Sequence, residues 1–411
     1  MAILAKLKNE FSFIRGNILI NAVTLVIVLV TASIPYTYYP KYIEGLGGNP
    51  FIVGVIGSAS YATLALVQIP GGYLADKHGR RQLTVIMTFA ISITYFLFSV
   101  APNWQVFMMA SILQNIFLVY QPALQALVAD STRPEKRGLG FSIINFLHYI
   151  SVPSPIIAGV LAVRFGLLPG MRIAYLIVTV AFLVVAILRT RFKETLEKTA
   201  EGNPLTGAIK NFPKSITESV KALKTESRPM LFLFASFAIY HFAWFMCSIY
   251  LISYALDILH IEEFEWAALM AWFSVVNILS ALPCGKIIDR FGRKKPLAAA
   301  WLLFTPALIG FVYGNIVIAS ISFLLLGVAL IVANTAYPAL MADFVAREKR
   351  GKIIGSTNFF FNILSSLGQF SGGFMYQYLS AELPFLLSAI LFIPCLILTL
   401  FKVHEPTSRE V

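Results

Sequence analysis

The sequence predicts an all-α integral membrane protein in which twelve transmembrane helices form two pseudo-symmetric six-helix bundles. Three observations predict this fold. The 411-residue chain is 58% hydrophobic and only 13% charged, whereas a soluble domain carries about 25% charged residues. Its apolar residues fall into twelve long runs, and a short charged motif occurs twice, 213 residues apart.

The twelve apolar runs are each long enough, or nearly so, to cross a hydrocarbon core that needs about 20 residues. They lie at 17–40, 51–74, 83–101, 104–129, 139–163, 172–190, 229–257, 264–286, 297–314, 316–341, 353–378 and 383–402. The first run is too long for the apolar region of a signal peptide, so we expect no cleavable signal. The runs predict one bundle at 1–190, a charged linker at 191–228 and a second bundle at 229–411.

The basic residues are distributed very unevenly between the two sides of the predicted spans. One side carries 29 of the 32 lysines and arginines, and the other carries only Lys41, Arg164 and Arg172. This bias predicts a multi-pass protein of the cell membrane with both termini and the linker in the cytoplasm. The net charge of +12 is therefore a topology signal, and we expect no nucleic-acid partner. Within the linker, Ile216, Val220 and Leu223 recur at helical spacing, which predicts either an amphipathic surface helix or a solvated tether.

The repeated motif is the most specific feature of the sequence. The first copy, at 72–81, reads GYLADKHGRR, and the second, at 285–294, reads GKIIDRFGRK. A further pair keeps the same offset, because the residues AD and EKRG occur within 129–138 and again within 342–351. Two motifs at one offset indicate that the whole half-chain is repeated, which is how many membrane transporters are built.

This doubled motif resembles the loop signature of the major facilitator superfamily of secondary transporters, and most closely its 12-helix, drug-efflux-like members. The resemblance covers all twelve spans. Its candidate conformational-switch residues are Gly72, Asp76, Gly79, Arg80, Arg81, Asp130, Asp289, Arg293 and Asp343. The resemblance implies two bundles that rock about a site near the membrane midplane. It also implies a small-molecule substrate and a lipid bilayer as partners, with no cofactor, and we expect a monomer.

The resemblance and elementary physical chemistry together assign roles to most of the switch residues. Gly72 lets two helices approach closely, and Gly79 supplies a backbone turn. Asp76 accepts backbone N–H groups where the eleventh helix begins, near Gly351, and Arg80 pairs with Asp130. The related set in the second half is Asp289, Arg293 and Asp343. These contacts hold the halves together on the cytoplasmic side, whereas the alternative is that the basic loops only fix topology.

The predicted membrane interior carries neutral polar side chains and no acidic or basic residue at mid-depth. This argues against a strongly charged substrate, since buried charges usually mark ion or substrate pathways. Amides are costly in lipid, so these residues face either neighbouring helices or a water-filled cavity. In the superfamily, helices 1, 4, 7 and 10 line the cavity. The candidate cavity residues are Asn21, Thr24, Gln114, Gln121, His241, Trp244, Asn334, Asn358 and Asn362.

Two histidines in predicted spans, His241 and His148, are candidates for proton coupling because imidazole titrates near neutral pH. The alternative is a neutral, hydrogen-bonded histidine. The sequence departs from drug/proton antiporters of the superfamily, which often carry an arginine in span 4. No arginine lies in the turns before Gln114, and the glycine-rich run of span 5 is degenerate at 154–159.

The preferred function is export of a small neutral or weakly charged, partly apolar solute by alternating access, with protons as a candidate coupling ion. Uptake of a neutral nutrient, by facilitated diffusion or proton symport, is the first alternative. A non-transporting membrane sensor or scaffold is the second. We expect no enzymatic activity, because the sequence shows no Ser/His/Asp arrangement and no phosphate-binding loop. Cys247, Cys284 and Cys395 lack metal-ligand spacing, so we expect no metal site.

Overall fold

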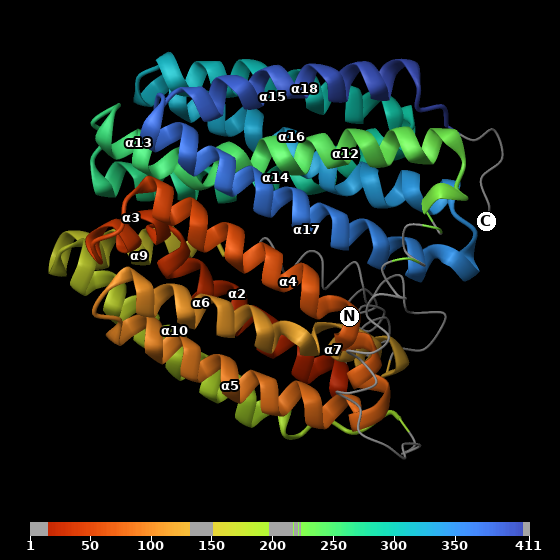
Figure 1. Ribbon diagram of the computed structural model, residues 1–411, viewed down its shortest axis with the longest axis horizontal. Coiled ribbons are helices and arrows are strands. Elements are labelled where there is room, and N and C mark those ends of the chain that lie inside the picture. Colours follow the sequence, from red (N-terminus) through yellow and green to blue (C-terminus); the bar gives the residue numbers. More distant parts are fainter. Residues whose placement is uncertain (1–14, 132–150, 197–216, 218–220, 222, 406–411) are drawn as a thin grey trace, which may run out of the picture.

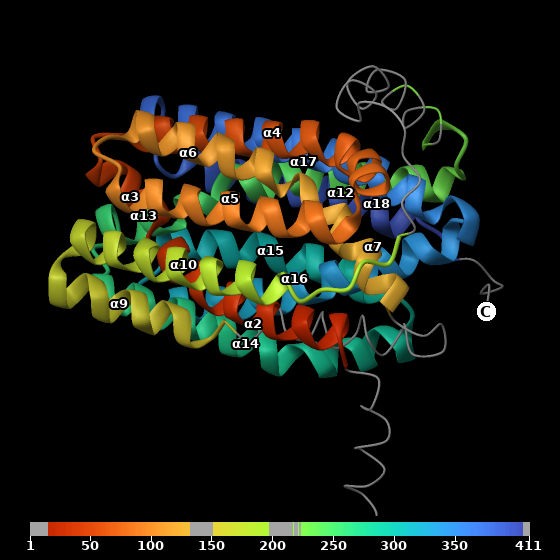
Figure 2. The same ribbon diagram turned by 90° about the horizontal axis from the view of Figure 1, so that it is seen from below.

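The computed structural model describes residues 15–131, 151–196, 217, 221 and 223–405, with the backbone alone at 69–70, 72–73, 75–78 and 347–348. All regular structure in these residues is helical. The two halves of the chain form two bundles, which lie one below the other in Figure 1 and whose helices run roughly side by side (Figure 2). The predicted all-helical membrane fold is confirmed.

In the described residues of the N-terminal half, seven helical elements are long and two are short. Their bounds are α2 (Asn17–Tyr36), α3 (Tyr39–Gly45), α4 (Pro50–His78), α5 (Arg80–Val100), α6 (Trp104–Phe117), the 3-10 helix η1 (Leu118–Tyr120), α7 (Gln121–Ser131), α9 (Pro153–Phe165) and α10 (Leu167–Arg189). The predicted fourth span is thus built from α6, η1 and α7. The break at η1 follows from Pro122, which lacks an N–H and whose ring crowds the carbonyl of Leu118.

The C-terminal half repeats this order. Its elements are α12 (Arg228–Cys247), the 3-10 helix η3 (Ser248–Tyr250), α13 (Leu251–Asp257), α14 (Glu263–Phe291), α15 (Lys294–Tyr313), α16 (Ile316–Phe344), α17 (Arg347–Tyr378) and α18 (Leu383–Phe401). The linker helix predicted around 216–223 falls largely outside the described residues.

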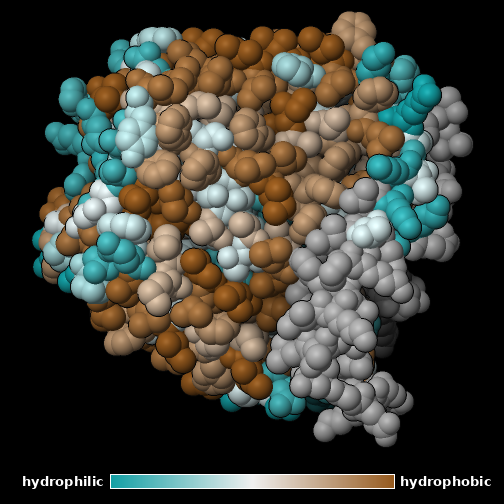
Figure 3. Space-filling view, in the orientation of Figure 1, coloured by the Kyte–Doolittle hydropathy of each residue, from teal (hydrophilic) through white to brown (hydrophobic). Residues whose placement is uncertain are grey.

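Ten helical segments in the described part of the chain are long and apolar enough to cross a membrane, judged by length and composition. The other two predicted spans correspond to α9, which is 13 residues long, and to α17, which is 32 residues long but more polar. A broad hydrophobic band covers the visible face of the molecule between two hydrophilic ends (Figure 3). This surface is what a protein surrounded by lipid requires.

Several helices begin where the sequence places an asparagine. The side chains of Asn49, Asn103 and Asn315 accept hydrogen bonds from backbone N–H groups in the first turns of α4, α6 and α16. These groups have no partner inside a helix, so the asparagines cap them. All three caps lie at the same end of the bundles, which we call the distal end. The opposite end, which carries Gly79 and Gly292, is called the motif end.

Candidate functional site

The two repeated loops at the motif end share one backbone geometry. Gly79 and Gly292 have φ angles of 85° and 82°, a region that favours glycine. A carboxylate lies against each glycine: a Cβ on Gly79 would be 2.8 Å from Glu194, and one on Gly292 would be 2.7 Å from Glu405. Glycine is therefore required at both positions for conformation and for space.

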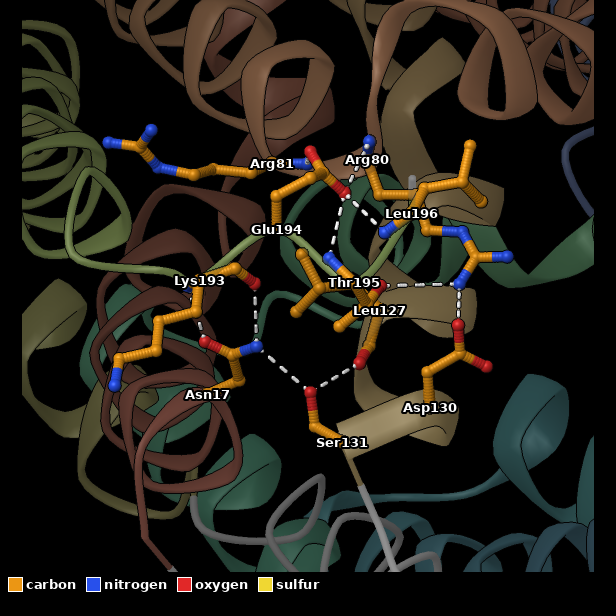
Figure 4. Close-up of polar contacts among 10 residues, drawn as sticks. All are labelled: Asn17, Arg80, Arg81, Leu127, Asp130, Ser131, Lys193, Glu194, Thr195 and Leu196. Carbon is orange, nitrogen blue, oxygen red and sulfur yellow. Dashed lines mark hydrogen bonds and ion pairs between the residues drawn. The ribbon is translucent and has the colours of Figure 1, made fainter. Parts of the chain in front are cut away.

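Each carboxylate caps the helix that follows its glycine. Glu194 accepts hydrogen bonds from the backbone N–H groups of Arg80 and Arg81 at the start of α5, at 3.2 and 2.9 Å (Figure 4). Glu405 accepts from the N–H groups of Arg293 and Lys294 at the start of α15. Burial opposes the charge of Glu194, but its backbone hydrogen bonds outweigh burial and hold the pKa of the carboxyl below its ordinary value. In each half, the segment that follows the sixth span therefore holds the loop between the second and third spans in place.

Sequence reasoning missed both glutamates. A signal was present, because Glu194 and Glu405 each follow shortly after the sixth span of their half. They are 211 residues apart, whereas the repeated motifs are 213 residues apart, so the two glutamates do not align in the repeat.

The structure contains the two arginine–aspartate pairs that join the loops to their own bundles. Arg80 forms an ion pair with Asp130 (Figure 4), and Arg293 lies 3.5 Å from Asp343. Arg81 instead donates to the carbonyl of Thr190. Asp289 is exposed on α14 and makes no ion pair with a described residue, so its place in this set stays a prediction.

The expected contact between Asp76 and the start of the eleventh helix is only partly described. Gly72 and Asp76 lie on α4, and their side-chain surroundings fall outside the described residues. The helix itself begins at Arg347, four residues before Gly351. The N–H of Gly351 therefore lies beyond the unpaired groups of the first turn. No described atom lies within 4 Å of the place that a Cβ on Gly351 would occupy.

The two halves are joined at the distal end by polar contacts that are distant in sequence. The ammonium of Lys41 lies 2.5 Å from Asp257 and 2.6 Å from Glu44, and Ser253 donates to Glu44 at 2.8 Å. Trp266 donates to the carbonyl of Thr37 at 3.0 Å. Burial lowers the pKa of Lys41, but the two carboxylates outweigh burial and raise it overall. We call Lys41, Glu44, Asp257 and Ser253 the distal clasp.

Helices α4 and α17 carry the contact between the halves further along the bundle. A Cβ on Gly54 would lie 3.0 Å from the Cα of Gly373, so the two backbones approach closely near the distal end. We call this contact between α4 and α17 the seam. Next along the seam, toward the motif end, the hydroxyls of Ser58 and Ser366 are 2.9 Å apart. Nearer the motif end, Asn362 donates to Gln68 at 3.3 Å, and beyond this pair the helices border a cavity.

Three adjoining cavities lie on the motif-end side of this seam. The N-half cavity has a volume of about 660 Å³ and is lined by α2, α5, η1, α7 and α10 among others. The bridging cavity, of about 480 Å³, lies between α7 and α17. The C-half cavity, of about 320 Å³, lies among α12, α16 and α17. Gln121 and Gln125 line both of the first two, and Gln68 and Asn358 line both of the last two, so the three cavities adjoin.

Most of the predicted cavity residues line these spaces. Those in the N-half cavity are Asn21, Gln114 and Gln121, and those in the C-half cavity are His241, Asn334, Asn358 and Asn362. Two expectations are wrong. Thr24 is fully buried and donates to the carbonyl of Asn21. Trp244 lines none of these three cavities and packs edge-on against Phe304 of α15. His148 lies outside the described residues.

His241 is held between aromatic rings in the wall of the C-half cavity. Its ring stacks on Phe361, with centroids 4.3 Å apart and an angle of 9° between the planes. Its Nδ1 lies 3.3 Å from the hydroxyl of Ser365 on α17. The imidazole therefore contacts the helix that forms the seam with the other half.

Sequence reasoning also missed Arg189 as a cavity residue, because it counted this residue, at the end of the run 172–190, with the basic residues of the following loop. The structure places Arg189 in the last turn of α10, with its side chain only 3% exposed and lining the N-half cavity. Its position at the end of an apolar run favoured a loop assignment, because nothing local shows that a long side chain folds back into the bundle.

Comparisons with known proteins agree with this architecture. The family model of the Major Facilitator Superfamily matches residues 22–368 and 233–411. The multi-drug resistance efflux pump PmrA of Streptococcus pneumoniae is 28% identical over 177 residues, which cover 41% of this chain and 43% of that protein. The chain thus spans less than half the length of that relative. The uncharacterised transporter MJ1317 of Methanocaldococcus jannaschii is 22% identical over 374 residues, 88% of both chains.

Among solved structures, a bacterial homologue of the human lysosomal transporter Spinster, crystallised in an inward-facing and unoccupied conformation, superimposes with a TM-score of 0.74. It is 13% identical and the match covers 95% of this chain and 98% of that one. At this identity the likeness shows the fold alone. Together with the family model, it identifies this chain as a multi-pass membrane transporter rather than an enzyme, and the chain belongs to the major facilitator superfamily.

Proposed function

We propose that this protein is a secondary transporter of the cell membrane that exports a small neutral or weakly charged, partly apolar solute by alternating access. The observation that carries the proposal is the asymmetry between the two ends. The distal clasp joins the halves, whereas toward the motif end the amide-lined bridging cavity lies between α7 and α17 of the two halves. A binding site that is open on one side and closed on the other is one state of an alternating-access cycle.

We assign the motif end to the cytoplasm, because it carries most of the basic residues. The structure then represents an inward-open state. The similarity to efflux pumps such as PmrA supports export. The solute class follows from the cavity walls, which combine amides with aromatic rings such as Tyr95, Tyr337 and Phe361.

The motif-end residues form the cytoplasmic gate in this proposal. Closing the motif end would bring the end of α4, with Asp76, toward the start of α17. Asp76→Asn should then reduce transport more than it reduces the amount of folded protein. Normal transport by a well-expressed variant would exclude a gating role for this carboxylate.

Transport can be tested in cells that lack their own efflux pumps, loaded with the neutral dye Nile red. We expect lower cellular fluorescence with the wild type than with empty vector. The matched control is Lys41→Cys/Asp257→Cys in a background without the three native cysteines. Oxidation should lock the distal end and abolish export, and reduction should restore it. Higher fluorescence with the wild type would favour uptake, and equal fluorescence at equal protein levels would contradict transport of this solute class.

A further inference from the structure

Arg189 places a buried positive charge in the wall of the N-half cavity. Its side chain is 3% exposed, and it comes from the last turn of α10. A charge removed from water is costly unless another charge or several hydrogen bonds compensate for it. The contacts of this guanidinium therefore indicate whether its role is purely structural.

Two neighbours hold the guanidinium in place. Its Nη1 donates to the hydroxyl oxygen of Thr88 at 2.8 Å, and its Cζ lies 5.3 Å from the centre of the Tyr120 ring. The hydroxyl of Thr88 donates its own proton to the carbonyl of Thr84 at 2.6 Å, which leaves its lone pairs for Arg189. These contacts orient the side chain, but neither of them supplies a negative charge.

The compensating anion is not found among the residues that the structure describes. No described carboxylate forms an ion pair with Arg189, and its Nε has no hydrogen-bond partner there. The acidic groups on the two adjoining segments, Asp130 of α7 and Glu194 after α10, have other partners, since Asp130 pairs with Arg80 and Glu194 accepts backbone N–H groups. The guanidinium thus retains donors for a bidentate bond to a carboxylate or phosphate.

The rest of the N-half cavity suits an apolar body attached to such an anion. Its walls include Tyr95, Phe182 and Leu124, with the amides of Gln114 and Gln121. Its volume of about 660 Å³ falls within the range of about 300–1,000 Å³ that small-molecule sites occupy.

We propose that the N-half cavity binds an amphipathic monoanion, whose carboxylate or phosphate group lies on Arg189 and whose apolar part lies against the aromatic wall. This inference rests on the proposed function and narrows its solute class. Arg189 lies in the last turn of α10 rather than at mid-depth, so the expectation of no charge at mid-depth is unaffected, while the cavity still offers a ligand one positive charge. A free organic anion and the phosphate of an anionic lipid share this chemistry.

The test uses the purified full-length protein in nanodiscs and three probes with one apolar body: 4-phenylbutyrate, 4-phenylbutyramide and 4-phenylbutylamine. Calorimetry should show tightest binding of the carboxylate. Arg189→Gln should weaken carboxylate binding about tenfold or more, as expected for a lost charge-assisted hydrogen bond, and leave amide binding unchanged. Arg189→Lys should recover part of the loss. Arg191→Gln removes the same charge from an exposed position two residues away and should bind like the wild type.

Lipid composition distinguishes the two sources of the anion. If a lipid headgroup occupies the site, phosphatidylglycerol nanodiscs should compete with 4-phenylbutyrate, and phosphatidylcholine nanodiscs should not. If a free solute does, both nanodiscs should give the same affinity. Equal binding of carboxylate and amide to the wild type, or unchanged carboxylate binding by Arg189→Gln, overturns the proposal. Carboxylate binding without export of any probe would instead contradict the transport function and leave the anion site standing.

Discussion

The ammonium of Lys41 in the N-terminal half lies 2.5 Å from the carboxylate of Asp257 in the C-terminal half. These residues are 216 positions apart in the sequence, and they meet only because the halves close at the distal end. Any outward-open state must break this pair, so the distal clasp contributes to the balance between conformations.

Replacing Lys41 should therefore shift the protein toward the outward-open state. Asp257 is half exposed, so the pair is expected to contribute no more than about 1 kcal/mol, and Lys41→Gln should change the inward-to-outward ratio by up to about fivefold. Distance measurements between spin labels on α3 and α13 would report the shift. Arg164→Gln, which removes an exposed distal charge, is the control. An unchanged distance distribution would show that the clasp is energetically neutral.

Removing the Glu194 cap should destabilise the first repeated loop. Glu194→Ala should lower the unfolding free energy by about 1 kcal/mol, which is typical for loss of a helix cap. Glu405→Ala should have a similar effect, since it makes the equivalent contact. Thermal unfolding followed by tryptophan fluorescence would measure both variants. A smaller effect than that of Glu382→Ala, which lies at the other end, would argue against a capping role.

The pH dependence of this effect has a definite sign. The folded-state pKa of Glu194 is below its ordinary value, so its stabilisation is present above that value, about 4.3, and is lost as the pH falls through the folded-state pKa. The stability difference between wild type and Glu194→Gln should therefore shrink as the pH is lowered from 5. A difference that stays constant across this range would exclude the charged carboxylate as its source.

Single cysteines should separate cavity residues from buried ones. In a cysteine-free background, cysteines at 21, 121 and 334 should react with a small water-soluble thiol reagent, because Asn21, Gln121 and Asn334 line the cavities. A cysteine in place of Thr24 should stay unreactive, because that position is fully buried. Mass spectrometry would quantify labelling. If all four positions label alike, the polar faces are not organised around one aqueous space.

Proton coupling is a separate prediction that concerns His241. If its imidazole carries the coupling proton, His241→Gln should abolish accumulation driven by a pH gradient and leave equilibrative exchange intact. Proteoliposomes with an imposed gradient would test this. His404→Gln, at an exposed position outside the spans, is the control. A variant that responds to the gradient like the wild type would make His241 a structural residue, and His148 the next candidate.

The placement of a side chain was predictable where it follows from the polar face of its own helix. It was not predictable where it depends on how that helix packs against a neighbouring helix. The amides at 121, 334 and 358 were candidates for the cavity walls from their polar spacing together with the resemblance to the superfamily, and they line the described cavities. The placement of Trp244 was not predictable, because whether it faces the cavity or α15 depends on how α12 is rotated within its bundle. Tertiary packing decides that rotation, and α12 is apolar around most of its circumference.

The sequence by itself determined the spans, their repeat in two halves and the glycine turns of the two loops. These are local properties, since an apolar run must cross the membrane and a positive φ favours glycine wherever it occurs. Only the tertiary structure decided which distant groups meet: Lys41 with Asp257, Glu194 with the start of α5, and Arg189 with the N-half cavity. The physical reason is that long charged side chains at helix ends can reach several neighbours, and only the packing of the helices selects among them.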